Sequence, residues 1–282
     1  RSGIYIPGGT APLFSSVLMM AIPAKIAGCP QISLVTPPGS EAGVDPAILY
    51  AASISGVTDI YQIGGAQAIA ALAYGTETVP KVDKIMGPGN QYVTKAKQLV
   101  NAEGTAIDMP AGPSELMVIA DNSAPPEFIA ADLLSQAEHG PDSQVFLVTT
   151  QASLPEKVNN SIETYLQKLP RQETARRALE NSKSIVLNSE TELMEFSNKY
   201  APEHLILATK NSTEMAVKIT NAGSVFLGNY TPESIGDYAS GTNHVLPTNG
   251  AAKAYSGINI DTFMKKITFQ RAIPEGLETI GK

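Results

Sequence analysis

Short apolar runs alternate with longer amphipathic segments along the chain. Runs such as 115–120 are rich in β-branched and other apolar residues, which is typical of buried strands. The expected strands are 3–7, 31–36, 59–63, 84–86, 115–120, 143–149, 184–187, 204–208 and 224–227. The expected helices lie near 14–27, 46–54, 66–74, 91–101, 126–137, 154–180, 190–198, 213–221 and 233–239. Because helix-length segments separate the strands, the pattern predicts βαβ units and mainly parallel sheets.

The predicted strands are too many for one small sheet. We therefore predict an α/β fold of two doubly wound, Rossmann-like lobes with mainly parallel sheets. A turn-rich stretch near the middle of the chain precedes a new strand and marks the boundary between the lobes. The expected divisions are a first lobe at 1–110, a second lobe at 111–258 and the start of a C-terminal tail at 259–282. Glycine and proline loops follow two first-lobe strands, at the carboxyl ends where open parallel sheets bind ligands.

Composition narrows the function classes. The 282 residues carry a net charge of −7, which argues against a protein that binds nucleic acid through its phosphates. An apolar stretch at 13–27 is too short, and too interrupted by Pro23 and Lys25, to span a bilayer. The single cysteine, Cys29, excludes an internal disulfide and suits a reducing compartment, so we expect a cytoplasmic protein, or a plastid protein if the source is a plant.

The chain contains only three histidines, and each lies in a compact polar motif. They are His139 in Gln-Ala-Glu-His-Gly, His204 in Pro-Glu-His-Leu and His244 in Gly-Thr-Asn-His-Val. Histidine titrates near neutral pH and is the commonest metal ligand. The three motifs therefore indicate metal binding, proton transfer or both.

Gln136 and His139 are three residues apart near the end of a predicted helix, so they share one face and could form half of a metal site. The alternative is a helix-terminal histidine that interacts with the helix dipole, followed by Gly140 as the helix stop.

Glu203 and His204 stand together at the entrance of a predicted strand. A carboxylate beside an imidazole offers two general bases whose pKa values can be tuned separately. The alternative is a surface ion pair at the start of the strand.

The segment 234–248, which contains Asp237 and His244, is dense in small polar residues and contains two glycines, which is typical of a loop that carries site residues. Asp237 would add an anionic ligand to Gln136 and His139 around zinc. The alternative is a segment that only caps a helix and forms turns.

The Gly87-Pro88-Gly89-Asn90 loop follows a strand and opens a helix, with Asp108 at about the spacing of an acidic ribose-binding residue. It has only two of the three glycines of a dinucleotide-binding turn, although a helix N-terminus there could bind an anion. Cys29 has no histidine or cation nearby in sequence that would activate it, so we interpret it as structural.

Taken together, these segments resemble the histidinol dehydrogenase family. The stretches that carry the resemblance are 5–14, 64–72, 85–93, 107–116, 132–143, 201–205 and 222–247. They include the strings YIPGGTAPLF, IMGPGNQYV, DLLSQAEHGPDS and SIGDYASGTNHVLP, and the similarity extends to about residue 258.

The resemblance implies an NAD- and zinc-dependent oxidation of L-histidinol to L-histidine through L-histidinal. It implies that His204 is the base for the substrate and that Glu203 activates the water that adds to the aldehyde. The implied zinc ligands are Gln136, His139 and Asp237. The implied substrate contacts are Ser114, Gln136, His139, His204, Asp237 and His244, and the implied cofactor contacts are Tyr5, Gln67 and Asn90. The first lobe would then be the cofactor side, and the second would carry the zinc and the bases.

The resemblance also implies a homodimer with shared active sites, in which a C-terminal tail gives the partner a further glutamate and a fourth zinc ligand, a histidine. No histidine follows His244, so we expect the chain to lack the family's N-terminal region and C-terminal tail, and to be of doubtful activity alone. Two alternatives stay open: an inactive core, and a zinc hydrolase that uses the same ligands with Glu203 as the base for water. Only the dehydrogenase needs both NAD and zinc.

Overall fold

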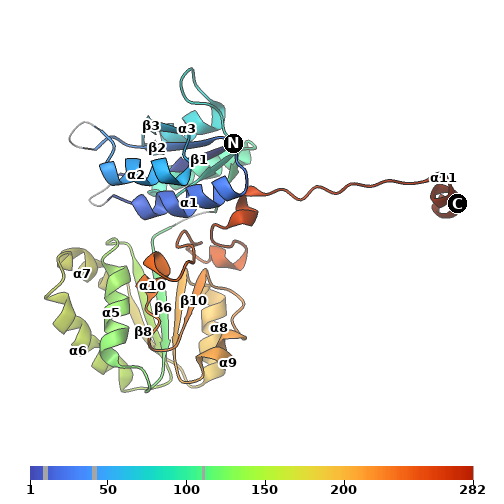
Figure 1. Ribbon diagram of the computed structural model, residues 1–282. Helices are drawn as coiled ribbons and strands as arrows, with labels where there is room; N and C mark the ends of the chain where they lie inside the picture. The colour runs from blue at the N-terminus through green and yellow to red at the C-terminus, as the bar shows by residue number, and fades with distance from the viewer. Residues whose placement is uncertain (9–11, 40–42, 110–111, 282) are drawn as a thin grey trace.

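The computed structural model describes residues 1–8, 12–39, 43–109 and 112–281, which form two α/β lobes and an extended C-terminal arm (Figure 1). Each lobe contains one five-stranded sheet. Every strand pairing between described residues is parallel. The predicted fold class, two doubly wound lobes with parallel sheets, is therefore confirmed.

The first sheet has the strand order β3-β2-β1-β4-β5. Its strands are β1 Ser2–Tyr5, β2 Ile32–Thr36, β3 Asp59–Gln62, β4 Lys84–Met86 and β5 Ala106–Ile107. Its helices are α1 Phe14–Ile26, α2 Pro46–Ser55, α3 Gly65–Tyr74 and α4 Gln91–Ala102. One apolar core joins α1 and α2 to one face of the sheet and a second core joins α3 and α4 to the other face. Two covered faces are what the continuous apolar character of the inner strands requires.

The second sheet has the strand order β10-β9-β6-β7-β8. Its strands are β6 Glu115–Ala120, β7 Gln144–Thr149, β8 Lys183–Val186, β9 His204–Ala208 and β10 Ser224–Leu227. Its helices are α5 Pro126–Ala137, α6 Leu154–Leu166, α7 Gln172–Glu180, α8 Glu190–Tyr200, α9 Ser212–Ala216 and α10 Glu233–Tyr238. A core under α5, α6 and α7 covers one face, and a core under α8 and α9 covers the other.

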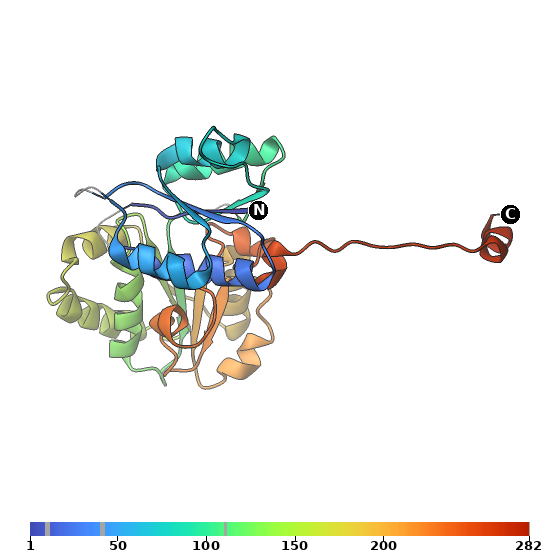
Figure 2. The same ribbon diagram turned by 45° about the horizontal axis from the view of Figure 1, so that its top comes forward.

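The segment after α10 returns from the second lobe to the first. Val245 and Ile258 pack in the core beside α1, and Lys84 Nζ donates to the carbonyl of Thr262 at 2.8 Å. This segment contains two short 3₁₀ helices, η1 Ala251–Lys253 and η2 Ile260–Phe263. Beyond them the chain leaves the body as an extended arm that ends in α11 Pro274–Ile280, and a second view confirms its direction (Figure 2). Among the described residues, no helix combines the length and apolar character needed to cross a bilayer.

The predicted strands and helices agree closely with those of the structure where apolar runs are long, and they differ from them where the runs are short. All nine expected strands exist, but the two-residue β5 was not expected. The single helix expected at 154–180 is wrong: α6 ends before Pro170, whose ring disfavours a continuous helix, and α7 begins after it. The helix expected at 213–221 ends already at Ala216. The predicted lobe boundary falls between residues 110 and 111, which lie outside the described residues, so the domain limits stay a prediction.

Candidate functional site

A cavity of about 560 Å³ lies between the two lobes. From the first lobe it is lined by the start of α1 and by residues that follow β4 and β5, such as Pro88 and Met109. From the second lobe it is lined by residues at the starts of β6 and β9, by the end of α5 and by α10. The cavity therefore lies at the carboxyl ends of the first sheet and the amino ends of the second.

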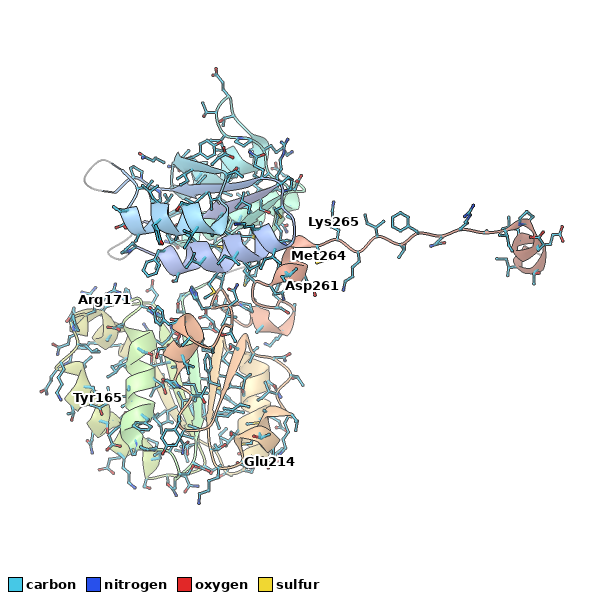
Figure 3. The ribbon with its side chains drawn as sticks, in the orientation of Figure 1. Tyr165, Arg171, Glu214, Asp261, Met264 and Lys265 are labelled. Atoms are coloured by element: carbon cyan, nitrogen blue, oxygen red, sulfur yellow. The ribbon has the colours of Figure 1, made fainter. Side chains whose placement is uncertain are left out.

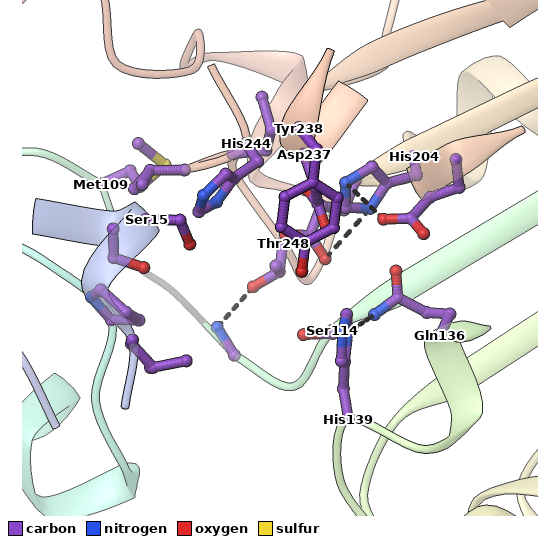
Figure 4. Close-up of a pocket in the computed structure, with 18 of the residues that line it drawn as sticks. Ser15, Met109, Ser114, Gln136, His139, His204, Asp237, Tyr238, His244 and Thr248 are labelled. Atoms are coloured by element: carbon purple, nitrogen blue, oxygen red, sulfur yellow. Dashed lines mark hydrogen bonds and ion pairs between the residues drawn. The ribbon is translucent and has the colours of Figure 1, made fainter. Parts of the chain in front are cut away.

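The cavity brings together every second-lobe residue that the sequence predicted for the site. They are Ser114, Gln136, His139, Glu203, His204, Asp237 and His244. The labelled members of this set come from several elements and point into one space (Figure 4).

The neighbours Glu203 and His204 are both held by one residue of the adjacent strand, Glu115. The backbone N–H of Glu115 donates to Glu203 Oε2 at 2.9 Å, and the carbonyl oxygen of Glu115 lies 3.2 Å from His204 Nδ1. An imidazole Nδ1 that faces a carbonyl carries the proton, so the neutral ring keeps its lone pair on Nε2. The pairing of β6 with β9 thus sets the orientation of both side chains.

His204 is neutral at physiological pH. Burial lowers its pKa to about 4, helped by the nearby His139 and His244, while the bond to the Glu115 carbonyl opposes the shift. The side chain keeps one open nitrogen in the cavity although the residue is only 5% exposed. A neutral imidazole with a free Nε2 can accept a proton from a bound molecule.

Burial raises the pKa of Glu203 well above its ordinary value, and the carboxylates of Glu115, Glu233 and Asp237 add to the rise. The backbone bond from Glu115 opposes it. Burial also raises the pKa of Glu115, whose Oε1 accepts from the backbone N–H of Asn249 at 2.8 Å. A buried carboxylate with a raised pKa is a stronger base than one in water.

Gln136 and His139 lie side by side at the end of α5. Gln136 Nε2 donates to His139 Nδ1 at 2.7 Å, and Gln136 Oε1 is buried with no hydrogen-bond partner. Desolvation in the cavity wall lowers the pKa of His139. A buried amide oxygen without a partner costs free energy unless a ligand satisfies it, so its place beside an imidazole fits a metal site.

Helix α10 places two carboxylates in the cavity. Among the described residues, His204, Glu233 and Asp237 bring possible ligand atoms within 4.8 Å of one another. Burial, Asp237 and Asp132 raise the pKa of Glu233 to about 7. This cluster shares Asp237 with the predicted ligand set but contains Glu233, which the sequence reasoning missed. The spacing could have revealed it, because residues four apart on a helix share a face.

The loop after α10 closes the cavity. His244 Nε2 is buried and has no hydrogen-bond partner, and the Thr248 hydroxyl accepts from the backbone N–H of Gly112. The alternative, in which this loop only caps a helix and forms turns, does not account for all of its contacts, because the loop also places His244 in the cavity wall.

The three predicted cofactor residues lie outside this cavity. Tyr5 ends β1 and its hydroxyl accepts from the backbone N–H of Gly65, at the start of α3 where Gln67 lies. Asn90 caps α4 by accepting from two backbone N–H groups, and it lines a second cavity that shares Ser114 and His139 with the first. Tyr5 is the last residue of a first-lobe strand, and Gln67 and Asn90 follow β3 and β4.

The loop before Asn90 is held by a buried ion pair. Lys97 Nζ bonds to Asp108 Oδ1 and donates to the Gly87 carbonyl at 2.9 Å, while Asp108 Oδ2 accepts from the Gly87 N–H at 2.8 Å. Gly87 has φ +117° and its Cα hydrogens face the backbone of Tyr5, so no other residue fits. The suggestion that Asp108 binds a ribose is therefore wrong, because this carboxylate is buried and paired.

Cys29 does not line the cavity between the lobes. Its Sγ lies 3.4 Å from Ser2 Oγ, and its side chain packs against the core beside α1. The structural interpretation of Cys29 agrees with this position.

The fold and the cavity define a two-lobed α/β protein with a neutral imidazole, buried carboxylates and an unsatisfied amide oxygen at one site. A family model described as histidinol dehydrogenase matches residues 1–282. The chain belongs to the histidinol dehydrogenase family. It is 62% identical over 281 residues to the histidinol dehydrogenase of Bacteroides thetaiotaomicron, covering 100% of this chain and 66% of that protein.

Comparison with solved structures gives the same family. The crystal structure of histidinol dehydrogenase from Elizabethkingia anophelis matches with a TM-score of 0.96 at 59% identity, over 100% of this chain and 65% of that one. An acetylating aldehyde dehydrogenase from Geobacillus thermoglucosidasius matches with a TM-score of 0.60 at 12% identity, over 97% of this chain and 75% of that one, which shows a shared fold alone. The chain spans about two thirds of the length of its family relatives.

Proposed function

We propose that this chain carries the active site of an NAD- and zinc-dependent enzyme that oxidises L-histidinol to L-histidine through L-histidinal, in histidine biosynthesis. Membership of the family supports the substrate and the reaction class. The observation that carries the proposal is the orientation of His204, a neutral imidazole whose Nε2 is open to the cavity because its Nδ1 faces the Glu115 carbonyl.

Two bases are needed because the reaction has two steps. Oxidation of the alcohol releases the hydroxyl proton, and His204 Nε2 accepts it. Oxidation of the aldehyde needs water added to the carbonyl, and Glu203 removes a proton from that water. The fixed position of Glu203 Oε2 on the Glu115 N–H leaves its other oxygen for this task.

Gln136, His139 and Asp237 would hold zinc. The partnerless, buried Gln136 Oε1 and the adjoining His139 ring fit such a group, and Asp237 lies in the same cavity. Zinc, when bound, supplies a positive centre that orients a substrate amine or imidazole. Ser114 and His244 line the same space and would contact the substrate, as would the three ligands and His204.

The first lobe would bind the cofactor through Tyr5, Gln67 and Asn90, which share the carboxyl edge of its sheet. NAD, when bound, supplies the two-electron oxidant for both steps. These residues lie at the carboxyl edge of the first sheet, the edge that faces the cavity, which supports separate roles for the two lobes.

We further propose a homodimer with shared active sites. The arm after η2 carries exposed apolar side chains, including Met264 at 56% and Phe269 at 92% exposure, and Figure 3 shows the arm extending away from the two lobes beyond Met264. Such side chains lose water contact when a second copy covers them. A cytoplasmic location suits the relatives named above, which are bacterial and give the plastid alternative no support.

The test uses His204→Asn and Gln136→Ala in the full-length protein, with NADH formation from L-histidinol and bound zinc measured in parallel. We expect His204→Asn to reduce NADH formation by about 10²- to 10⁴-fold with zinc content retained. We expect Gln136→Ala to lose zinc and activity together, while the exposed Gln167→Ala, the same chemical change outside the cavity, keeps both.

Full turnover by His204→Asn would show that another group is the base. Zinc-dependent hydrolysis without NAD would favour the hydrolase alternative, and absence of both zinc and NADH in the unsubstituted protein would favour an inactive core.

A further inference from the structure

We infer that Glu233 is a positioning residue for the base: its carboxylate holds the His204 ring and stabilises the imidazolium that forms when His204 accepts the substrate proton. The inference rests on the proposed function and deepens it, since the roles argued above for the bases, ligands and cofactor residues leave Glu233 without one.

The Glu233 carboxylate lies beside the His204 ring. Its Oε1 lies 3.6 Å from His204 Nε2, the ring nitrogen that does not face the Glu115 carbonyl. Glu233 is only 2% exposed, so solvent does not screen this pair. The carboxylate therefore faces the atom that gains the proton.

The other contacts of Glu233 fix it in place. Its Oε2 accepts from the Ser135 hydroxyl at 3.2 Å, and its backbone N–H donates to Asp132 Oδ1 at 3.1 Å. Both partners lie on α5, so α10 is docked at its first residue against the helix that ends with Gln136 and His139. The orientation of the carboxylate is set from outside the cavity and does not depend on a bound molecule.

One oxygen of this carboxylate has no partner. Glu233 Oε1 is buried and makes no hydrogen bond among the described residues. A buried carboxylate oxygen left in that state costs free energy, which a donor supplied during the reaction would recover. Protonation of His204 places a positive charge at Nε2, 3.6 Å from this oxygen, and so supplies the missing electrostatic partner.

Oxidation of the alcohol needs no reagent besides His204 and NAD. The hydroxyl O–H bond of the alcohol breaks and its proton forms a bond to His204 Nε2, while the electron pair of the C–H bond passes to NAD, the oxidant of the proposed function. The positive ring then lies between the carboxylates of Glu233 at Nε2 and Glu203, whose Oε2 is 3.7 Å from Nδ1. Other ionisable groups that face the ring are Glu115 on β6, Asp237 on α10, His139 after α5 and His244 on the closing loop.

The test compares Glu233→Gln, which keeps the shape and removes the charge, with Glu233→Asp in the full-length, zinc-loaded protein. We expect Glu233→Gln to lower kcat for L-histidinol by at least about tenfold, with KM changed less than about twofold and zinc content unchanged. The solvent deuterium isotope effect on kcat should rise because proton transfer becomes slower. Glu233→Asp should recover part of the loss, and Glu195→Gln, the same chemical change at an exposed position on α8, should match the unsubstituted protein.

Unchanged kcat in Glu233→Gln, or a change confined to KM, would overturn the inference. Loss of zinc would also overturn it and would make Glu233 a ligand in the cluster with His204 and Asp237.

If the unsubstituted protein formed no NADH, the proposed function would fail, and nuclear magnetic resonance of the His204 ring would still decide the inference. Glu233→Gln should then shift the ¹⁵N resonance of His204 Nε2 at pH 8, where the Glu233 carboxylate is ionised, and an unchanged resonance would reject the role.

Discussion

The two lobes have the same strand order but use opposite ends of their sheets. Counted within each lobe, both sheets run third, second, first, fourth, fifth strand. The first lobe faces the cavity with loops that follow its strands, as ligand sites in parallel sheets usually do. The second lobe faces it with the starts of β6 and β9 and with the end of α5.

The difference matters because the two ends offer different chemistry. At the carboxyl ends the first lobe offers backbone turns, and its buried carboxylate, Asp108, is neutralised by Lys97. At the amino ends the second lobe offers side chains, and burial raises the pKa of Glu115, Glu203 and Glu233. One lobe is suited to hold a ligand rigidly and the other to move protons.

The largest expected effect comes from removing a base of the second lobe. Glu203→Gln should reduce NADH formation from L-histidinal by about 10²- to 10⁴-fold, because the water that adds to the aldehyde loses its base. The first oxidation, which uses His204, should suffer less. Single-turnover assays that start from L-histidinol and from L-histidinal measure the two steps. Equal losses in both would contradict separate roles for the two bases.

The next effect tests the rigid turn of the first lobe. Lys97→Met leaves Asp108 buried without its cation, which should lower the free energy of unfolding by about 3–5 kcal/mol. Lys95→Met is the matched control, since Lys95 is exposed two residues earlier on α4 and should change stability by less than about 0.5 kcal/mol. Urea unfolding of the two variants measures the difference. Equal midpoints would show that the ion pair does not hold the turn.

A smaller effect concerns the stability of the second lobe. The pKa of Glu233 is raised to about 7, so the folded state binds more protons than the unfolded state between about pH 4.5 and 7. Its contribution to stability is present below pH 4.5 and is lost as the pH rises through 7. Glu233→Gln should therefore stabilise the protein at pH 7 by about 1–3 kcal/mol and give little gain at pH 4.5.

Urea unfolding at both pH values checks this expectation. An increase in stability of the same size at both pH values would show that the carboxylate charge does not cause the increase. A decrease in stability at pH 7 would mean that the Glu233 side chain stabilises the folded protein.

The sequence predicted the fold well because most inner strands are uninterrupted apolar runs. The run at 115–120 became a fully buried central strand, whereas β5 has two residues and no periodic signal. Pro170 could have been used to divide the helix expected at 154–180, because proline disfavours helix at the residue before it.

The site was only partly predictable. The three histidines were found because each lies in a short polar motif, and all three line one cavity. Glu233 was missed although its spacing from Asp237 predicts a shared helix face. The roles of Glu115 could not be read from sequence, since its N–H and carbonyl act on Glu203 and His204 through pairing of distant strands.

The central claim is that the second lobe holds His204 as a neutral base with an open Nε2. Nuclear magnetic resonance of ¹⁵N-labelled imidazoles tests it directly, because the chain has three histidines and the His204→Asn variant assigns the signal. The account predicts that the His204 ring is neutral at pH 7 with its proton on Nδ1, and that it takes up a second proton only near pH 4. A ring protonated on Nε2 at pH 7, or one that titrates at its ordinary pKa, would contradict it.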